Sequence, residues 1–224
     1  MTGFINIALS AIKWPVAVLA MAALPALIIS LFQVLASGQG NPTRLGLFLL
    51  GALVYFFLDK LIFRRHAVGS WFSTFEHEVT HAVFAWLTLH RVTGMRVTYR
   101  KGGHVTFVGG GNWLIYIAPY WFPTLCIPLM FYPVFFNGSN PWWAGLLGFV
   151  FMFHHISTWR ETHTDQSDLH ETGLVFAWMF LPPANILSAG IVIAYAYGHT
   201  ALVATFLKLT FDTLSVYSAF LLGI

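Results

Sequence analysis

The chain has 224 residues, of which 58% are hydrophobic and only 8% are charged. Because a soluble domain carries about 25% charged residues, this composition excludes an ordinary soluble domain and predicts one membrane-embedded, all-α polytopic domain over residues 1–224. Eleven Lys and Arg against eight Asp and Glu leave a small basic excess. In a protein whose partner is the lipid bilayer, such an excess reflects topology and gives no reason to expect nucleic-acid binding. Cys126 is the only cysteine, which excludes an intrachain disulfide and a cysteine-ligated zinc site.

Apolar stretches follow one another along the chain, and most approach the roughly 20 residues with which a helix crosses a bilayer. Lys60, Arg64 and Arg65 close the second stretch and predict a cytoplasmic end there. Asp59, beside Lys60, is expected to form a local ion pair without chemistry. The fourth stretch contains several prolines and is not expected to be a straight helix. We expect about six to seven transmembrane segments, at 12–36, 45–63, 71–89, 113–136, 142–159, 172–197 and 201–222.

Residues 92–108, between the third and fourth segments, differ in character from the apolar stretches. Two β-prone runs flank Gly102-Gly103, and a second glycine run, 109–111, follows, which predicts a β-hairpin. Backbone groups near a membrane must be paired or hydrated, so the hairpin is expected in a protein-lined cavity or at the interface. One hypothesis is that the free edge of the hairpin holds an extended peptide by strand addition. The other is that this is an ordinary surface hairpin, and the sequence leaves both open.

The third apolar segment contains His77-Glu78-Val79-Thr80-His81, a His-Glu-x-x-His motif. On a helix, positions i and i+4 lie on one face about one turn apart, so the imidazoles of His77 and His81 converge. Two neutral imidazoles on one face provide the first two ligands of a zinc ion, and Glu78 can then act as general base. The alternative is a polar seam between helices, but ionisable groups inside an apolar segment are costly and usually functional.

A catalytic zinc site usually has three protein ligands, and the third must come from another part of the chain. Residues 160–171 form the only strongly polar stretch. A carboxylate from this stretch would suit a hydrolytic site, because it neutralises part of the metal charge. His154 and His155, in the fifth apolar segment, compete as ligands, although a histidine hydrogen-bonded between helices is the commoner case. The able side chains of the polar stretch are His163, Asp165, Asp168 and His170.

These features together resemble the site-2 proteases, a family of intramembrane zinc metalloproteases, in a divergent bacterial-type form. The resemblance rests on the His-Glu-x-x-His motif in an apolar segment, the Gly-rich hairpin after it, two further apolar segments and an aspartate downstream of them. It covers a core of about residues 71–187 and leaves 1–66 and 199–224 as accessory segments. The family often places its aspartate in an Asn-x-x-Pro…Asp-Gly pattern. This chain departs from that pattern, because Leu169 follows Asp168.

The resemblance implies a zinc metalloendopeptidase with one Zn²⁺ per chain, held by His77, His81 and a downstream aspartate, and with Glu78 as the catalytic residue. Asp168 is the first choice for the third ligand, since its place just before a new apolar helix would point it back into the membrane, and Asp165 is the second choice. The substrate implied is a membrane-anchored protein, hydrolysed at a peptide bond in or near its transmembrane segment.

Two more residues are candidates for substrate contact. His104 in the hairpin would approach a substrate, and Asn112 would stabilise a tetrahedral oxyanion. Two other functions stay open, a metal-binding membrane transporter and a catalytically inactive scaffold. Glu78 discriminates between hydrolase and transporter, because only hydrolysis requires a general base. The compact size and the lack of eukaryotic sorting features favour an integral multi-pass protein of the bacterial cytoplasmic (inner) membrane.

The number of crossings constrains the metal hypothesis. If segments 71–89, 113–136 and 142–159 all cross the membrane, the polar stretch lies on the opposite side from His77 and His81 and cannot share a metal with them. At least one of these segments must therefore be short, re-entrant or broken. The proline-rich fourth segment and the short motif helix are the candidates.

Overall fold

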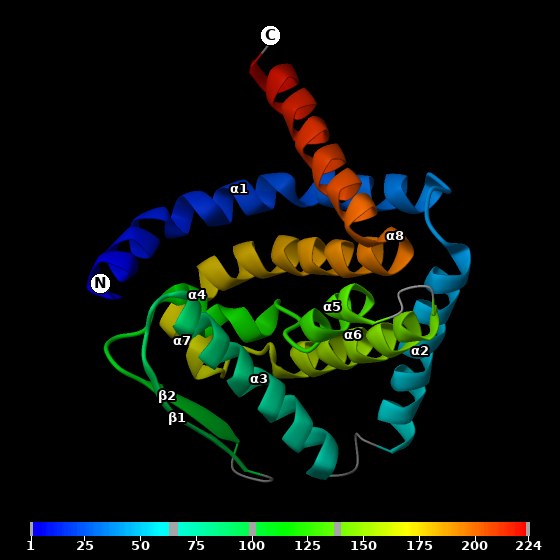
Figure 1. The fold of residues 1–224 in the computed structure, drawn as a ribbon. Coiled ribbons are helices and arrows are strands. Elements are labelled where there is room, and N and C mark those ends of the chain that lie inside the picture. The colour runs from blue at the N-terminus through cyan, green and yellow to red at the C-terminus, as the bar shows by residue number, and fades with distance from the viewer. Residues whose placement is uncertain (1, 63–66, 99–101, 137–139, 223–224) are drawn as a thin grey trace.

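The structure, a computed structural model, describes residues 2–62, 67–98, 102–136 and 140–222. Helices make up most of it, and a two-stranded antiparallel sheet lies beside them (Figure 1). This confirms the predicted class, an α-helical protein with a small β-hairpin. In chain order the elements are α1 (Thr2–Ala36), α2 (Pro42–Leu61), α3 (Ala67–Leu87), β1 (Val92–Val97), β2 (Gly103–Phe107), α4 (Trp113–Ile117), the 3-10 helix η2 (Ala118–Tyr120), α5 (Cys126–Phe135), α6 (Trp142–Glu161), α7 (Ser167–Thr172) and α8 (Leu174–Leu222).

Two helices of the described chain combine the length and the apolar composition needed to cross a bilayer, Thr2–Ala36 and Leu174–Ala219. α1 lies along the first half of α8 (Figure 1). At Gly198 and His199 the backbone angles of α8 are not helical, and beyond this bend the helix leaves the body of the molecule (Figure 1). This break falls between the last two predicted segments, 172–197 and 201–222, which are therefore two helices joined at a sharp kink. The predicted number of crossings stays a prediction.

α2 packs against α6 with the two backbones in direct contact. A Cβ atom built on Gly51 would lie 1.8 Å from the carbonyl oxygen of Gly145, and one built on Gly148 would lie 1.9 Å from that of Phe48. No side chain fits in these gaps, so glycine is required at both positions. Small residues let helices approach closely inside a membrane, where packing contacts drive helix association.

The same two helices are joined by an ion pair near their C-terminal ends. The buried carboxylate of Asp59 on α2 binds the guanidinium group of Arg160 on α6. The predicted local pair with Lys60 is therefore wrong, and the Lys60 ammonium group instead lies 4.1 Å from the centroid of the Phe56 ring. Two basic residues of the predicted cytoplasmic end lie outside the described residues, Arg64 and Arg65.

The proline-rich fourth segment, one of the two candidates for the short, re-entrant or broken segment that the metal hypothesis requires, is broken. α4 ends after five residues, η2 follows with Pro119 at its centre, and the chain passes Pro123 before α5 begins at Cys126. α4 and η2 contact α3 instead of crossing beside it, and α4 also contacts α7. The break thus brings the polar stretch that ends in α7 onto the same side as the motif on α3.

An aromatic cluster holds the broken segment against the start of α8. The Trp113 ring centroid lies 5.0 Å from that of Phe176 and 5.7 Å from that of Phe180. Tyr120 is buried in the same cluster. Such packing is needed, because a helix as short as α4 is not stable on its own.

The hairpin predicted at about 92–108 is confirmed. β1 and β2 pair antiparallel, with Val97 opposite Gly103 and Met95 opposite Val105, and the register shifts between Val92 and Gly94. Residues 99–101, between the strands, lie outside the described residues. Both strands contact α3, so the hairpin lies beside the motif helix (Figure 1).

Candidate metal centre

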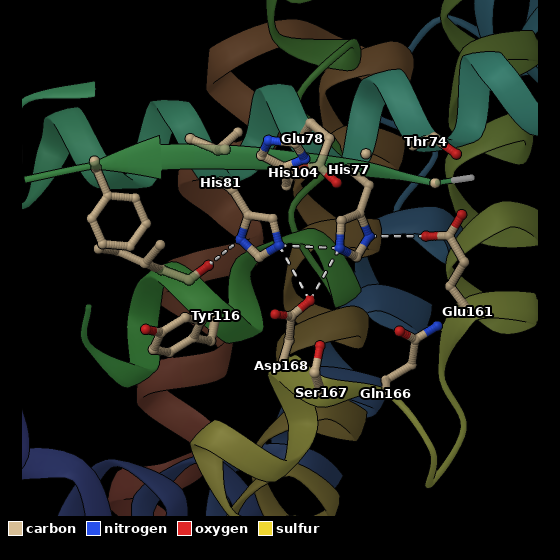
Figure 2. Close-up of a pocket in the computed structure, with 15 residues that line it drawn as sticks. Thr74, His77, Glu78, His81, His104, Tyr116, Glu161, Gln166, Ser167 and Asp168 are labelled. Atoms are coloured by element: carbon tan, nitrogen blue, oxygen red, sulfur yellow. Dashed lines mark hydrogen bonds and ion pairs between the residues drawn. The ribbon is translucent and has the colours of Figure 1, made fainter. Parts of the chain in front are cut away.

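His77 and His81 lie one turn apart on α3 and face one cavity. Their ring centroids are 4.7 Å apart and their Nε2 atoms 3.1 Å apart (Figure 2). The four-residue spacing produces this arrangement directly, because side chains at i and i+4 stand on one face of a helix. The sequence therefore predicted this half of the site without knowledge of the fold.

Asp168 brings a carboxylate to the same point from the first turn of α7. Its Oδ2 atom lies 3.3 Å from the Nε2 atoms of both His77 and His81 (Figure 2). One ligand atom from each of these three residues lies within 4.8 Å of the other two, a spacing that suits a single metal ion. Asp165, the second choice for this ligand, is exposed and is not part of the group.

Each histidine donates its other ring nitrogen to a fixed acceptor. The Nδ1–H group of His77 donates to Oε2 of Glu161 at 2.9 Å, and that of His81 donates to the Ile115 carbonyl oxygen at 2.8 Å. Carboxylates and carbonyl groups only accept hydrogen bonds, so the ring protons belong on Nδ1 and the lone pairs on Nε2. Both lone pairs are then free at the point where Asp168 Oδ2 lies.

Sequence reasoning missed two residues that support the ligands, Glu161 and Tyr120. Glu161 also accepts a hydrogen bond from the Ser73 hydroxyl group, and the Tyr120 hydroxyl group donates to Asp168 Oδ2 at 3.3 Å. Glu161 lies in the polar stretch 160–171, where a search for histidine partners as well as ligands would have found it. Tyr120 gave no such signal, because its position depends on the break after α4.

The surroundings keep Asp168 ionised. Burial acts to raise the pKa of its carboxyl group, but the neighbouring imidazole rings of His77 and His81 outweigh burial and hold that pKa well below its usual range. Two neutral imidazoles and one carboxylate form a donor set that catalytic zinc sites use, with a fourth position left for water. The acceptor behind each imidazole is also typical of zinc sites. The residues present therefore fit one Zn²⁺ ion.

Glu78 lies against the start of β2, at the wall of a cavity of about 400 Å³ that also contains the three ligands. A Cβ atom on Gly103 would lie 2.6 Å from Cγ of Glu78, so the backbone of β2 packs directly against this side chain. Only 6% of Glu78 is exposed. Glu78 and the three candidate metal ligands thus line one cavity, with the hairpin along one side of it (Figure 2).

The two candidates for substrate contact lie in different places. His104 of β2 lines the cavity (Figure 2). Asn112 caps the N-terminus of α4: its Oδ1 atom accepts from the backbone N–H groups of Leu114 and Ile115, and it is 5% exposed. Its amide is thus engaged in holding α4, and it is not among the residues that line the cavity.

His154 and His155 are not part of the metal group. Nδ1 of His154 lies 3.2 Å from Oε1 of Glu76, on the opposite side of α3, and both side chains are buried. His155 Nδ1–H donates to the Phe151 carbonyl oxygen at 2.9 Å within α6. These contacts agree with the expectation of histidines bonded between or within helices.

The model of the peptidase M50B-like family matches residues 47–219, which is more than half of the chain. The chain belongs to the site-2 protease (M50) family. The match includes the His-Glu-x-x-His motif, the hairpin and Asp168, and leaves α1 outside. Site-2 proteases are membrane-embedded zinc metalloproteases, so membership supports a protease of this type. No curated protein and no solved structure matches the chain.

Proposed function

We propose that the protein is an intramembrane zinc metalloendopeptidase that hydrolyses a peptide bond in or near a transmembrane segment of a membrane-anchored protein. His77, His81 and Asp168 would hold one Zn²⁺, and Glu78 is the general base. The observation that carries the proposal is the convergence of three ligand atoms, from elements far apart in the sequence, in the cavity that Glu78 borders.

Zn²⁺ in this site supplies Lewis-acid activation of water and of the peptide carbonyl group. Glu78 takes the proton of the attacking water on a carboxylate oxygen and passes it to the nitrogen of the leaving amine. The buried position of Glu78 keeps bulk water from competing for that proton. Glu161 and the Ile115 carbonyl group keep the His77 and His81 protons on Nδ1 through the reaction.

The hairpin supports a mode of substrate binding. A helical substrate must unwind locally, because its amides are already hydrogen-bonded and its carbonyl groups are shielded. β2 pairs with β1 along one edge, and its residues Gly103, His104 and Val105 line the cavity. An unwound peptide would add to the other edge of β2 by main-chain hydrogen bonds, with His104 beside it.

An integral multi-pass protein of the bacterial inner membrane, with about six to seven crossings, is part of this proposal. Family membership and the two long apolar helices support the membrane location. The presence of Glu78 in the cavity favours a hydrolase over a metal transporter or an inactive scaffold, because neither of those requires a general base.

Zinc content of the detergent-purified chain tests the proposal. Wild type and Asp165→Asn are expected to hold about one Zn²⁺ per chain, whereas His81→Ala and Asp168→Asn should hold far less. Asp165→Asn is the matched control, since it removes an equal charge from the same polar stretch. A wild-type chain that stays zinc-free after reconstitution at neutral pH, or Asp168→Asn with full zinc content, would contradict the proposed site.

A further inference from the structure

The N-terminal end of α1 is hydrogen-bonded to the base of the hairpin and the start of α4. Asn6 Nδ2 donates to the Gly110 carbonyl oxygen at 2.8 Å, and Asn112 Nδ2 donates to Asn6 Oδ1 at 2.9 Å. The Trp113 indole N–H donates to the Leu9 carbonyl oxygen at 2.7 Å. All of α1 lies outside the residues matched by the family model, 47–219. These contacts nevertheless lead toward the metal centre.

The link from Asn6 to α4 passes through both ends of one amide group. Asn112 uses Oδ1 to accept from the backbone N–H groups of Leu114 and Ile115, at 3.1 Å each, and uses Nδ2 to donate to Asn6. A carbonyl oxygen accepts and an amide nitrogen donates, so the bond to Asn6 reinforces the orientation of the Asn112 amide that the cap requires. Asn6 thereby holds the cap of a helix that has only five residues.

The link continues from α4 to the metal ligand. Ile115, whose N–H group the Asn112 cap holds, is fully buried, and its carbonyl oxygen accepts from His81 Nδ1–H at 2.8 Å. A continuous chain of hydrogen bonds therefore runs from α1 through the α4 cap to the ring whose Nε2 atom faces Asp168.

We propose that Asn6 is a positioning residue of the metal centre, because it fixes the Asn112 cap and with it the Ile115 carbonyl group that orients His81. This inference rests on the proposed zinc site. It makes α1 part of the scaffold of the active site, although the family model does not include it. Zinc affinity, and not only stability, then depends on the first turns of the chain.

α1 has other attachments that keep it docked when Asn6 is changed. The Trp113–Leu9 hydrogen bond does not involve Asn6. The Lys13 ammonium group lies 5.0 Å from the Phe176 ring centroid, and the Trp14 ring centroid lies 6.1 Å from that of Phe176. A variant of Asn6 is therefore expected to fold, and loss of the Asn6 amide can be tested by itself.

The test measures the zinc dissociation constant of the full-length chain in detergent by competition with a chromophoric chelator. Asn6→Ala removes the acceptor for Asn112. Asn112→Asp keeps oxygen acceptors for the α4 cap but removes the donor to Asn6, so the two variants break the same bond from opposite sides. Ser10→Ala, at an exposed position on the same helix, is the matched control.

Asn6→Ala and Asn112→Asp are each expected to weaken zinc binding about tenfold, and the double variant no further than either single one. The visible absorption bands of the Co²⁺-substituted chain should shift in both variants and stay unchanged in Ser10→Ala. Wild-type affinity and spectra in both single variants, or fully additive effects in the double variant, would overturn the inference while the zinc site stands. A wild type that binds neither ion overturns the proposed function itself, and the inference with it.

Discussion

Helix α3 has two polar faces that differ in how their hydrogen-bonding groups are used. On the face toward α7, His77 and His81 each give one nitrogen to a protein acceptor and leave the other free beside Asp168. On the face toward α6, Glu76 lies 3.2 Å from His154, and the Thr80 hydroxyl group lies 2.6 Å from that of Thr124, which ties α3 to the stretch before α5.

This difference in the use of hydrogen-bonding groups distinguishes the candidate metal site on one face of α3 from a structural contact on the other. Buried polar groups need partners, and on the α6 face Glu76 and Thr80 find them in the protein. On the α7 face the arrangement leaves nitrogen lone pairs and a carboxylate oxygen directed at one point, which is what a cation binds. Substitutions on the α7 face should therefore affect metal binding and activity, and those on the α6 face should affect stability.

Glu78→Gln is expected to have the largest effect on activity. The amide cannot accept the proton of the attacking water, so the rate of substrate cleavage should fall about a thousandfold or more, while zinc content stays at the wild-type value. Cleavage of a membrane-anchored reporter in proteoliposomes, together with metal analysis, measures both. Full cleavage activity in this variant would show that Glu78 is not the general base.

Glu161→Gln is expected to weaken zinc binding without removing a ligand. The neutral amide is a poorer acceptor for His77 Nδ1–H than the carboxylate, so the zinc dissociation constant should rise about ten- to a hundredfold. Glu171→Gln, at an exposed position at the end of α7, is the control with the same change of charge. Equal zinc affinity in the two variants would mean that the contact with His77 does not orient the ligand.

Glu76→Ala tests the opposite face of α3. It leaves the His154 ring buried without its carboxylate partner, so the free energy of unfolding should fall by about 3 kcal/mol, measured by denaturant titration in detergent micelles. Glu76→Leu combined with His154→Leu removes both polar groups and should cost less than Glu76→Ala alone. The folded fraction of each variant should still bind zinc. Loss of zinc binding by folded Glu76→Ala would show that the α6 face of α3 also supports the metal site.

The sequence predicted the features that depend on local spacing. The His77–His81 pair follows from helical periodicity, and the hairpin follows from β-prone runs around Gly102-Gly103. The prolines of the fourth segment and the need for a shared metal together predicted that this segment is broken. Each of these inferences uses residues close together in the chain or a direct physical requirement.

The remaining features depend on tertiary packing that no local pattern records. The partner of Asp59 is Arg160, on a helix far away in the sequence, and not the neighbouring Lys60. Asp168 and Asp165 are equally able ligands by chemistry; the place of Asp168 before the next apolar helix favoured it, but only the fold brings its carboxylate to the two histidines. The Asn6–Asn112 contact likewise joins segments more than a hundred residues apart.

Thr80→Val is expected to have the smallest effect. It tests whether a contact outside the metal site, but within the motif, affects zinc binding. Thr80 lies between the motif histidines in sequence but is fully buried, and its hydroxyl group contacts Thr124 in the stretch before α5. Valine has nearly the same shape, so the change removes two hydrogen bonds, one from the Thr80 hydroxyl group to the Glu76 carbonyl oxygen and one with the Thr124 hydroxyl group. A loss of about 1 kcal/mol in the free energy of unfolding is expected, with zinc affinity and cleavage rate unchanged. A marked fall in zinc affinity would instead show that the contact between Thr80 and Thr124 sets the rotation of α3, and with it the direction of both imidazoles.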